Sequence, residues 1–190
     1  MIARGEFPLL QTARLQLRQL RSEDDAGALF DCFSRDDVTA YYDLESFTSR
    51  QQAVELIESW NERFANGEGI RFAITLHSST DRVIGTCGFH NWAKEHFKAE
   101  VGYELHPDYW RQGVMTEALD AVVRYGFAEM GLNRIDAFID PANESSRRLL
   151  AKCGFREEGT MRDYFFEKNS FVDAVLFGLL KRDLALQGGD

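Results

Sequence analysis

The chain has 190 residues, of which 44% are hydrophobic and 28% are charged, and its formal net charge is −9. The length and the 15 Phe, 6 Tyr and 3 Trp residues argue for one folded domain and against a disordered chain. The acidic balance argues against binding to a nucleic-acid backbone and suits a cationic substrate, although solubility alone explains it equally well.

Targeting and metal-binding signals are weak in this sequence. No apolar run approaches the roughly 18–20 residues of a membrane span, and Met1–Phe7 lacks the apolar core of a signal peptide. The cysteines Cys32, Cys87 and Cys153 form no CxxC pair, and no two histidines stand at i, i+4. We therefore expect a cytoplasmic protein with no metal, no nucleic-acid partner and no membrane contact.

The first third of the chain predicts one strand and two helices. Alternating apolar residues predict a strand over Arg14–Leu20. Ser22, with Asp25 three residues on, predicts the N-cap of a helix whose apolar stripe runs to Phe33. A capping box at Ser49–Gln52 opens a second helix, which repeats apolar residues every 3.6 positions and ends at Asn66–Gly67.

The rest of the chain alternates strands and helices. Period-2 runs predict strands, and apolar stripes followed by glycine predict helices. The predicted strands cover Ile70–His77, Val83–Trp92, Lys98–Leu105, Arg134–Ile139, Phe155–Arg162 and Phe171–Leu180. The predicted helices cover Thr116–Met130 and Glu144–Lys152. The turn Ser78–Asp81 joins the first two of these strands, and Gln187–Asp190 is expected to be a loose tail.

The order of these elements, β-α-α-β-β-β-α-β-α-β-β, predicts a mixed α/β fold. No repeat or linker divides the sequence, so we expect a single domain over residues 1–190. We also expect an antiparallel front half and a parallel crossover through the helix at Thr116.

The segment from Glu100 to Ala118 is the strongest candidate for chemistry. A strand ends near Leu105, and a loop containing Gly113 then enters the helix at Thr116. A helix N-terminus presents unpaired N–H groups and a positive dipole end, which suit a pyrophosphate. Gly113 allows close approach of the backbone, and Arg111 adds a positive charge. An ordinary strand-turn-helix is the alternative interpretation, and this argument names no ligand.

Two motifs resemble a known family. The run Tyr109–Ala118 reads Tyr-Trp-Arg-Gln-Gly-Val-Met-Thr-Glu-Ala, and it resembles the acetyl-CoA pyrophosphate loop of the GNAT superfamily, in particular its RimJ/RimL-type branch. Asn143–Ser146, with the downstream Lys152 and Gly154-Phe155, resembles a second signature of that branch. Smaller matches are Thr12–Leu15, Ile84-Gly85 and Asp173, so the resemblance covers about residues 12–182. Met115 is bulkier than the usual residue at its position.

The resemblance implies a GNAT-like fold and acetyl-CoA as co-substrate. It implies that the backbone of Leu105 pairs with the pantetheine arm and that Asn143 bonds the pantetheine amides, although Asn143 also suits a helix N-cap. The pyrophosphate would lie against the loop residues Arg111, Gln112, Gly113, Val114, Met115 and Thr116. Ser146 matches a serine near the cofactor sulfur, where its hydroxyl would stabilise or protonate the departing thiolate. A surface serine is the alternative.

The general base is left open among several residues. Glu100 and Glu104 share one strand face, and Glu100 aligns with a carboxylate common in the branch. His90, Asp163 and Tyr164 are further candidates, and Tyr164 could equally serve as an acid for the thiolate. A solvated strand face is an equally good explanation of the two glutamates.

Acceptor contacts are expected from Asp36–Phe47 and from His90. Tyr41, Tyr42 and Phe47, with the acidic residues around them, would frame a cationic amine, or would form only a small loop cluster.

The branch suggests a protein N-terminal α-amine as acceptor, attacked on the thioester within a ternary complex. A small-molecule amine such as an aminoglycoside, polyamine or amino acid is the alternative. Two other classes are a non-catalytic module that binds acyl-CoA and a protein that uses the loop for another nucleotide diphosphate. A homodimer is left open.

Overall fold

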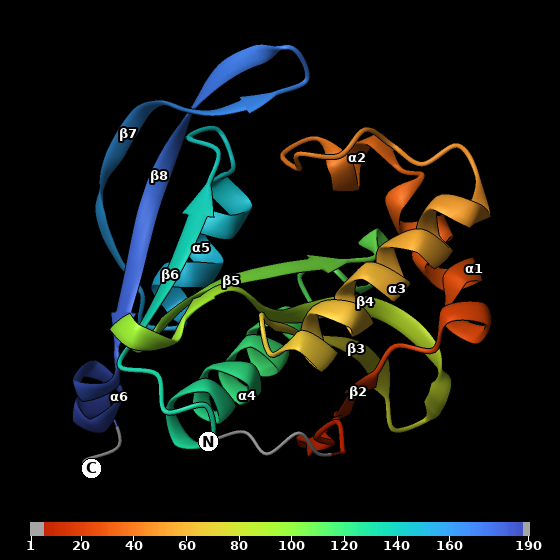
Figure 1. The fold of residues 1–190 in the computed structure, drawn as a ribbon, viewed down its shortest axis with the longest axis horizontal. Helices are drawn as coiled ribbons and strands as arrows, with labels where there is room; N and C mark the ends of the chain where they lie inside the picture. The colour runs from red at the N-terminus through yellow and green to blue at the C-terminus, as the bar shows by residue number, and fades with distance from the viewer. Residues whose placement is uncertain (1–5, 188–190) are drawn as a thin grey trace.

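The computed structural model describes residues 6–187. Within them, eight strands form one sheet in the order β1-β2-β3-β4-β5-β6-β8-β7 (Figure 1). The strands are β1 (Leu10–Gln11), β2 (Leu15–Gln19), β3 (Ile70–Leu76), β4 (Ser79–Ala93), β5 (Lys98–Leu105), β6 (Arg134–Ile139), β7 (Arg156–Glu167) and β8 (Ser170–Leu180). All neighbouring pairs are antiparallel except β5 and β6, which are parallel. This confirms the predicted mixed sheet and its parallel crossover.

Six α-helices and two short 3₁₀ segments connect the strands of the described range. They are α1 (Ser22–Phe33), α2 (Asp36–Thr39), α3 (Arg50–Asn66), η1 (Lys94–His96), η2 (Pro107–Tyr109), α4 (Val114–Ala128), α5 (Glu144–Lys152) and α6 (Lys181–Gln187). None of the helices in residues 6–187 has the length and apolar character needed to cross a bilayer. Most of Met1–Phe7, where no signal peptide was expected, and of the tail Gln187–Asp190 lies outside the described residues.

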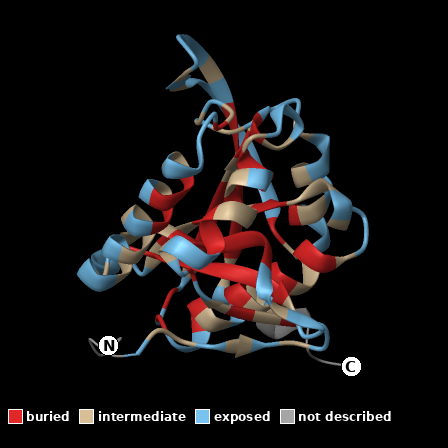
Figure 2. Ribbon diagram, turned by 90° about the vertical axis from the view of Figure 1, so that its right-hand side faces the viewer, coloured by how far each residue is buried: buried red, intermediate tan, exposed pale blue. Residues whose placement is uncertain are grey.

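The helices cover the two faces of the sheet in separate groups. On one face, α1 and α3 pack on each other and on β4 and β3, with Phe33, Ile57 and Ala73 in a small core. On the other face, α4 and α5 cover a larger core that includes Phe72, Leu119 and Leu150. Figure 2 shows the buried residues concentrated in the middle of the molecule, while the tip of the β7–β8 hairpin is mostly exposed. The sheet therefore separates two helical layers.

Local sequence signals explain the elements that match. Gln52 Oε1 accepts from the Ser49 N–H at 3.0 Å, which completes the predicted capping box, and Gly67 ends α3 with a φ of 69°. The bounds of β5, β6 and α5 coincide with those predicted. All three cysteines are free.

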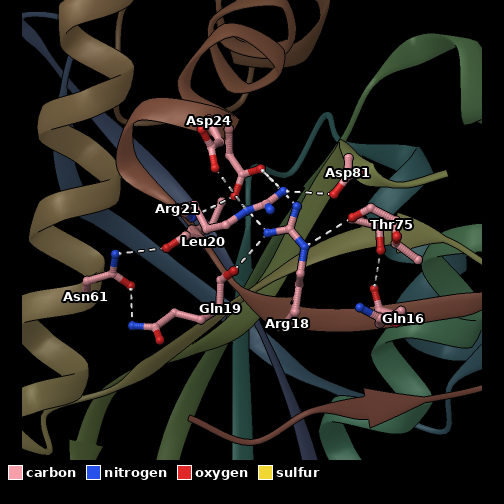
Figure 3. A network of polar contacts seen from close by, with 11 residues as sticks. Gln16, Arg18, Gln19, Leu20, Arg21, Asp24, Asn61, Thr75 and Asp81 are labelled. Atoms are coloured by element: carbon pink, nitrogen blue, oxygen red, sulfur yellow. Dashed lines mark hydrogen bonds and ion pairs between the residues drawn. The ribbon is translucent and has the colours of Figure 1, made fainter.

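The start of α1 differs from the prediction. Arg21, and not Ser22, is the N-cap residue, and the Asp25 Oδ2 atom accepts from the Arg21 N–H at 2.6 Å. Both terminal nitrogens of Arg18, on β2, also donate hydrogen bonds to the Asp25 carboxylate, at 2.8 and 2.9 Å. Figure 3 shows this network around Arg18 and Arg21, with Asn61 of α3 reaching the Leu20 carbonyl at 3.1 Å. These contacts bind the α1–α3 layer to the sheet.

The last strand pair is longer than predicted. β7 continues beyond Arg162 to Glu167. A bulge between Met161 and Phe165 interrupts its pairing with β8, and the pairing resumes at Phe165. Within the bulge, Asp163 has a φ of 49° and its N–H donates to Asp173 Oδ1 at 2.9 Å. Asp173 therefore fixes the bulge, and the β7–β8 hairpin projects beyond the rest of the sheet (Figure 1).

Candidate functional site

Strands β5 and β6 part in the middle of the sheet. Their parallel pairing joins only Lys98–Glu100 to Arg134–Asp136, although β5 continues to Leu105 and β6 to Ile139. Beyond the paired residues, both strands line one cleft with a volume of about 1270 Å³. One edge of β5 stays paired with β4 as far as Leu105, so its other edge offers peptide groups to the cleft.

The loop after β5 forms one end of this cleft. Gly113 is the N-cap of α4 with a φ of 74°, and Arg111 has a φ of 58°. The helix begins at Val114, two residues before the predicted start, so the N–H groups of its first turn belong to Val114, Met115 and Thr116. It ends at Ala128, two residues before the predicted end. The earlier start follows from the left-handed conformation of Gly113, which turns the chain directly into the helix.

Most of the predicted cofactor residues line the cleft. These are Leu105, Arg111, Gly113, Val114, Met115, Thr116, Asn143 and Ser146. Gln112 does not: its backbone carbonyl oxygen accepts from Arg14 Nη1 at 2.9 Å, on the outer side of the loop. The Leu105 carbonyl oxygen accepts from the Trp110 indole N–H at 2.7 Å, so part of the predicted pairing edge is already engaged.

Asn143 and Ser146 are joined at the start of α5. Asn143 is the N-cap residue, and its Oδ1 atom accepts from the Ser146 N–H at 3.0 Å. The helix-cap interpretation of Asn143 is therefore confirmed. Its amide nitrogen is not used by this contact, so the same side chain can still donate to a ligand in the cleft.

A buried ion pair lies in the other half of the cleft. Glu104 accepts from Arg71, Thr86 and Tyr42, the last at 3.1 Å, and Arg71 Nε also donates to the Thr86 hydroxyl at 2.6 Å. Arg71 and Glu104 are 8% and 6% exposed. Burial disfavours the charge on Arg71, but the Glu104 carboxylate outweighs this and raises the pKa of Arg71. The guanidinium also lies over the Trp60 ring at 4.9 Å.

The sequence analysis did not single out Arg71. The available signal was a charged residue inside the strand Ile70–Leu76, which is otherwise almost entirely apolar. Such a position requires a partner, because an unpaired buried charge is costly. Its partner, Glu104, is on the next strand but one.

Glu100 lies further along the same strand face, in a more open setting. Its Oε2 atom accepts from Asn91 Nδ2 at 3.0 Å and lies 3.4 Å from His90 Nε2. Burial acts to raise the pKa of Glu100, but His90, Asn91 and the charge of Lys98 together hold that pKa below its ordinary value. Glu100 is therefore ionised at neutral pH, and both Glu100 and His90 line the cleft.

The segment Asp36–Phe47 is divided between the cleft and the core. Tyr41 and Tyr42 line the cleft, whereas Phe47 is 8% exposed and stacks on Phe33 with ring centroids 5.2 Å apart. The helix α2, which the sequence analysis did not anticipate, occupies part of this segment. Phe47 thus supports the α1–α3 layer from inside.

Acidic groups gather at the mouth of the cleft. Asp37, Asp43 and Glu167 all line it. Burial raises the pKa of Glu167, and the charge of Asp43 raises it further. The hairpin tip reaches across to α2, where Lys168 Nζ donates to the Thr39 carbonyl at 2.8 Å. Asp37 is paired with Arg35, whose Nε and Nη2 atoms lie 3.1 Å from its two carboxylate oxygens, so Asp43 and Glu167 are the carboxylates here that would favour a positively charged ligand.

Tyr164 lies beside the cleft. Its ring stacks on Phe138 with centroids 5.1 Å apart, and Phe138 lines the cleft. The side chain of Tyr164 is 44% exposed, so solvent as well as Phe138 surrounds it. No group of three or more potential metal ligands is found within residues 6–187.

The family model and the relatives that match this chain are all described as acetyltransferases. Residues 14–156 match the family model described as the Acetyltransferase (GNAT) domain. The chain is 43% identical to the uncharacterized N-acetyltransferase YoaA of Bacillus subtilis, over 92% of this chain and 98% of that one. It is 32% identical to the [Ribosomal protein uS5]-alanine N-acetyltransferase of Escherichia coli, over 65% of this chain and 63% of that one.

A solved structure shares the fold. RimL, a ribosomal L7/L12 alpha-N-protein acetyltransferase in complex with coenzyme A, superposes with a TM-score of 0.81 at 16% identity. The match covers 91% of this chain and 98% of RimL.

Proposed function

The chain belongs to the GNAT family of acetyltransferases, and we propose that it transfers an acetyl group from acetyl-CoA to a primary amine, with a protein N-terminal α-amine as the acceptor. The observation that carries this proposal is the parting of β5 and β6 at the cleft that the N-terminus of α4 also lines. It combines an open strand edge with an anion-binding helix terminus inside one cleft.

The residues present fit the cofactor. The first-turn N–H groups of Val114, Met115 and Thr116 and the positive end of α4 suit the pyrophosphate, and Arg111 adds charge. The peptide groups of β5 suit the pantetheine amides, with Asn143 as a further donor. When bound, acetyl-CoA supplies the thioester carbonyl that the amine attacks.

The two glutamates of β5 take different roles in this proposal. The Glu104 oxygens are occupied by Arg71, Thr86 and Tyr42, so Glu104 is assigned to the floor of the acceptor side. Glu100 is half-buried, ionised and next to His90, and it is assigned to receive the acceptor ammonium and to help remove its proton. Because its pKa is low, Glu100 is a weak base: it pairs with the acceptor ammonium, and water carries the proton away before the amine attacks.

The acceptor assignment rests on two observations. The relative from Escherichia coli is named for an alanine of a ribosomal protein, and RimL for the α-amino group of L7/L12. In this chain, the mouth of the cleft between α2 and the β7–β8 hairpin carries Asp43 and Glu167, besides Asp37, which is paired with Arg35. Carboxylates at this place suit a cationic chain terminus that enters from outside.

Two measurements test the proposal. Calorimetric titration with acetyl-CoA, with ATP and NAD as controls, should show selective binding of acetyl-CoA. Release of free thiol from acetyl-CoA should then require an amine. The panel contains four acceptors. The first is a peptide with a free N-terminus, and the second is that peptide with its N-terminus blocked and a lysine inside it. The third is a polyamine, and the fourth is an aminoglycoside.

Each outcome points to one class of protein. Acetylation of the free-terminus peptide alone supports the proposal. Preference for the polyamine or the aminoglycoside makes it a small-molecule acetyltransferase. Binding of acetyl-CoA without thiol release from any amine favours an acyl-CoA-binding module. Preference for ATP or NAD over acetyl-CoA in folded protein contradicts the cofactor assignment.

A further inference from the structure

One nitrogen of the buried Arg71 guanidinium has no hydrogen-bond partner within residues 6–187. Nε donates to the Thr86 hydroxyl at 2.6 Å, and Nη2 donates to Glu104 and, at 3.0 Å, to the Tyr42 hydroxyl. These contacts leave both hydrogens of Nη1 unused. Nη1 also keeps surface that solvent can reach, although the rest of the side chain is almost entirely buried. A charged donor is therefore open to the cleft that Arg71 lines.

The register of the sheet explains how this nitrogen reaches β5. Arg71 on β3 lies opposite Gly88 on β4, and Gly88 lies opposite Gly102 on β5. Neither glycine has a side chain, so the long side chain of Arg71 can cross the row that they form. A Cβ added to Gly102 would lie only 2.9 Å from Nη1. Gly102 follows the part of β5 that pairs with β6, so Nη1 lies at the open stretch of that strand.

His90 borders the same place from another side. The Cβ added to Gly102 would lie 3.4 Å from His90 Cε1. The Nε2 atom of the same ring is 3.4 Å from Glu100 Oε2. The position of the missing Gly102 side chain therefore has an unused charged donor on one side. On the other side lies the histidine that contacts Glu100, the carboxylate assigned above to the acceptor ammonium.

A donor and a carboxylate placed in this way suit an amine that is followed by a carbonyl group. Standard bond lengths place the amine nitrogen and the carbonyl oxygen of one amino-acid residue about 3 Å apart. The side-chain amine of lysine and the amines of a polyamine have no oxygen so near. The charge of Arg71 is already balanced by Glu104, which would repel a carboxylate at this place. A neutral carbonyl oxygen therefore fits Nη1 better than the carboxylate of a free amino acid.

We propose, building on the function proposed above, that Arg71 Nη1 donates a hydrogen bond to the carbonyl oxygen of the acceptor's first residue while Glu100 holds the α-ammonium group of that residue. Gly102 keeps the space between the two contacts free. Arg71 is then the residue that distinguishes a peptide N-terminus from other primary amines. A site built to donate to a substrate oxygen rejects an analogue that lacks the oxygen, because its own buried donor is left unpaired.

The direct test uses the wild-type protein and acceptors that differ only at the first carbonyl. Thiol release from acetyl-CoA is measured with a free-terminus peptide and with the same peptide in which a trans carbon–carbon double bond replaces the first peptide bond. Values of kcat/KM are calculated for the unprotonated amine, because the amine pKa differs between acceptors. Loss of a hydrogen bond to a charged donor should lower kcat/KM for the alkene by about ten- to a hundredfold. The amide of the first amino acid should likewise be a better acceptor than the free amino acid.

A glycine variant then assigns this preference to Arg71 without removing the buried charge. The methyl group of Gly102→Ala would displace Nη1 and fill the space beside it. The preference for the peptide over the alkene should fall by about tenfold, while acetyl-CoA binding, measured by calorimetry, stays as in the wild type. The matched control is Gly27→Ala on α1, where an added Cβ has no atom within 4 Å. It should keep the full preference.

The outcomes separate this inference from the proposed function. The inference stands if the wild type prefers both carbonyl-bearing acceptors and only Gly102→Ala loses the preference. Equal kcat/KM for peptide and alkene in the wild type overturns the inference and leaves the proposed function intact. A preference for the free amino acid over its amide also overturns it, because a carboxylate is then the group recognised. A folded Gly102→Ala that keeps the full preference removes the role of Arg71. If that variant does not fold, the wild-type comparison decides. Absence of thiol release with the free-terminus peptide contradicts the proposed function itself.

Discussion

The Arg14 guanidinium fastens the loop that precedes α4 by donating to the Gln112 carbonyl oxygen at 2.9 Å. The same side chain donates through Nε to Glu117 Oε2 at 2.6 Å, and Thr12 donates to the other Glu117 oxygen at 2.5 Å. The N-terminal segment thus holds the carbonyl side of the loop, and the N–H side is left facing the cleft.

Loss of the Arg14 contacts with Gln112 and Glu117 should weaken cofactor binding specifically. Arg14→Ala removes a two-pronged contact, and we expect the Kd for acetyl-CoA to rise by about tenfold, equivalent to about 1.4 kcal/mol. Arg14→Lys should recover little, because lysine lacks the planar fork. The control is Arg124→Ala, which breaks an exposed pair with Asp120 on the same helix. Equal Kd values for Arg14→Ala and wild type in calorimetry would refute the role of Arg14 in cofactor binding.

The left-handed conformation of Gly113 allows a matched pair of glycine variants. Gly113 and Gly131 have φ values of 74° and 70°, so alanine at either position should cost about 1–2 kcal/mol of stability. Only Gly113 lies in the cleft, where an added Cβ would be 3.4 Å from Arg14 Nη2. Thermal unfolding should show similar losses for both variants, and only Gly113→Ala should weaken acetyl-CoA binding. An equal effect of both on binding would mean that the loop conformation is not critical.

The buried pair of Arg71 and Glu104 should be much more important for stability than Glu100. Glu104→Gln leaves the Arg71 charge buried without its counter-ion, and we expect a loss of about 3–5 kcal/mol in the free energy of unfolding. Replacing both residues with leucine should restore much of that loss. Denaturant titration of Arg71→Leu, Glu104→Leu and the double leucine variant measures the coupling. Additive effects would show that the two charges do not depend on each other.

Glu100→Gln should reduce catalysis while the fold remains. We expect kcat/KM for the acceptor to fall by about a hundredfold, with little change in stability. In the wild type, His90, Asn91 and Lys98 outweigh burial and hold the pKa of Glu100 below its ordinary value, so its protonation does not limit the rate at neutral pH. The rate should instead rise with pH until the acceptor amine is deprotonated, near pH 8 for an α-amine and near pH 10 for a lysine or polyamine. A rate that keeps rising until about pH 10 would contradict an α-amine acceptor.

Asp25 should govern stability in acid. Burial acts to raise its pKa, but Arg18, the Arg21 N–H and the two positive charges hold that pKa below its ordinary value of 3.8. Its stabilisation is therefore fully present above that ordinary, unfolded-state pKa and is lost as the pH falls through the lower folded-state pKa. Asp25→Asn should lower the free energy of unfolding by about 3 kcal/mol at pH 7. It should also make that free energy less dependent on pH below pH 4. Asp24→Asn, at an exposed neighbour in the same network, should change neither (Figure 3).

The elements that the sequence missed are short or interrupted. The four residues of α2 are too few to show a helical period, and β1 has only two residues. The bulge at Asp163 places polar residues in the middle of β7 and breaks its alternation. The helix α6 follows the last predicted strand without a turn signal between them.

The sequence by itself determined the features that depend on near neighbours. Capping at Ser49, the alternation of β5 and the loop around Gly113 each involve residues a few positions apart, so their pattern is visible in the chain. Only the tertiary structure decided which groups meet. Arg71 and Glu104 are 33 residues apart, and Arg14 and Gln112 are 98 apart. Such contacts depend on strand order, register and the parting of β5 from β6, which long-range packing sets and local pattern does not encode.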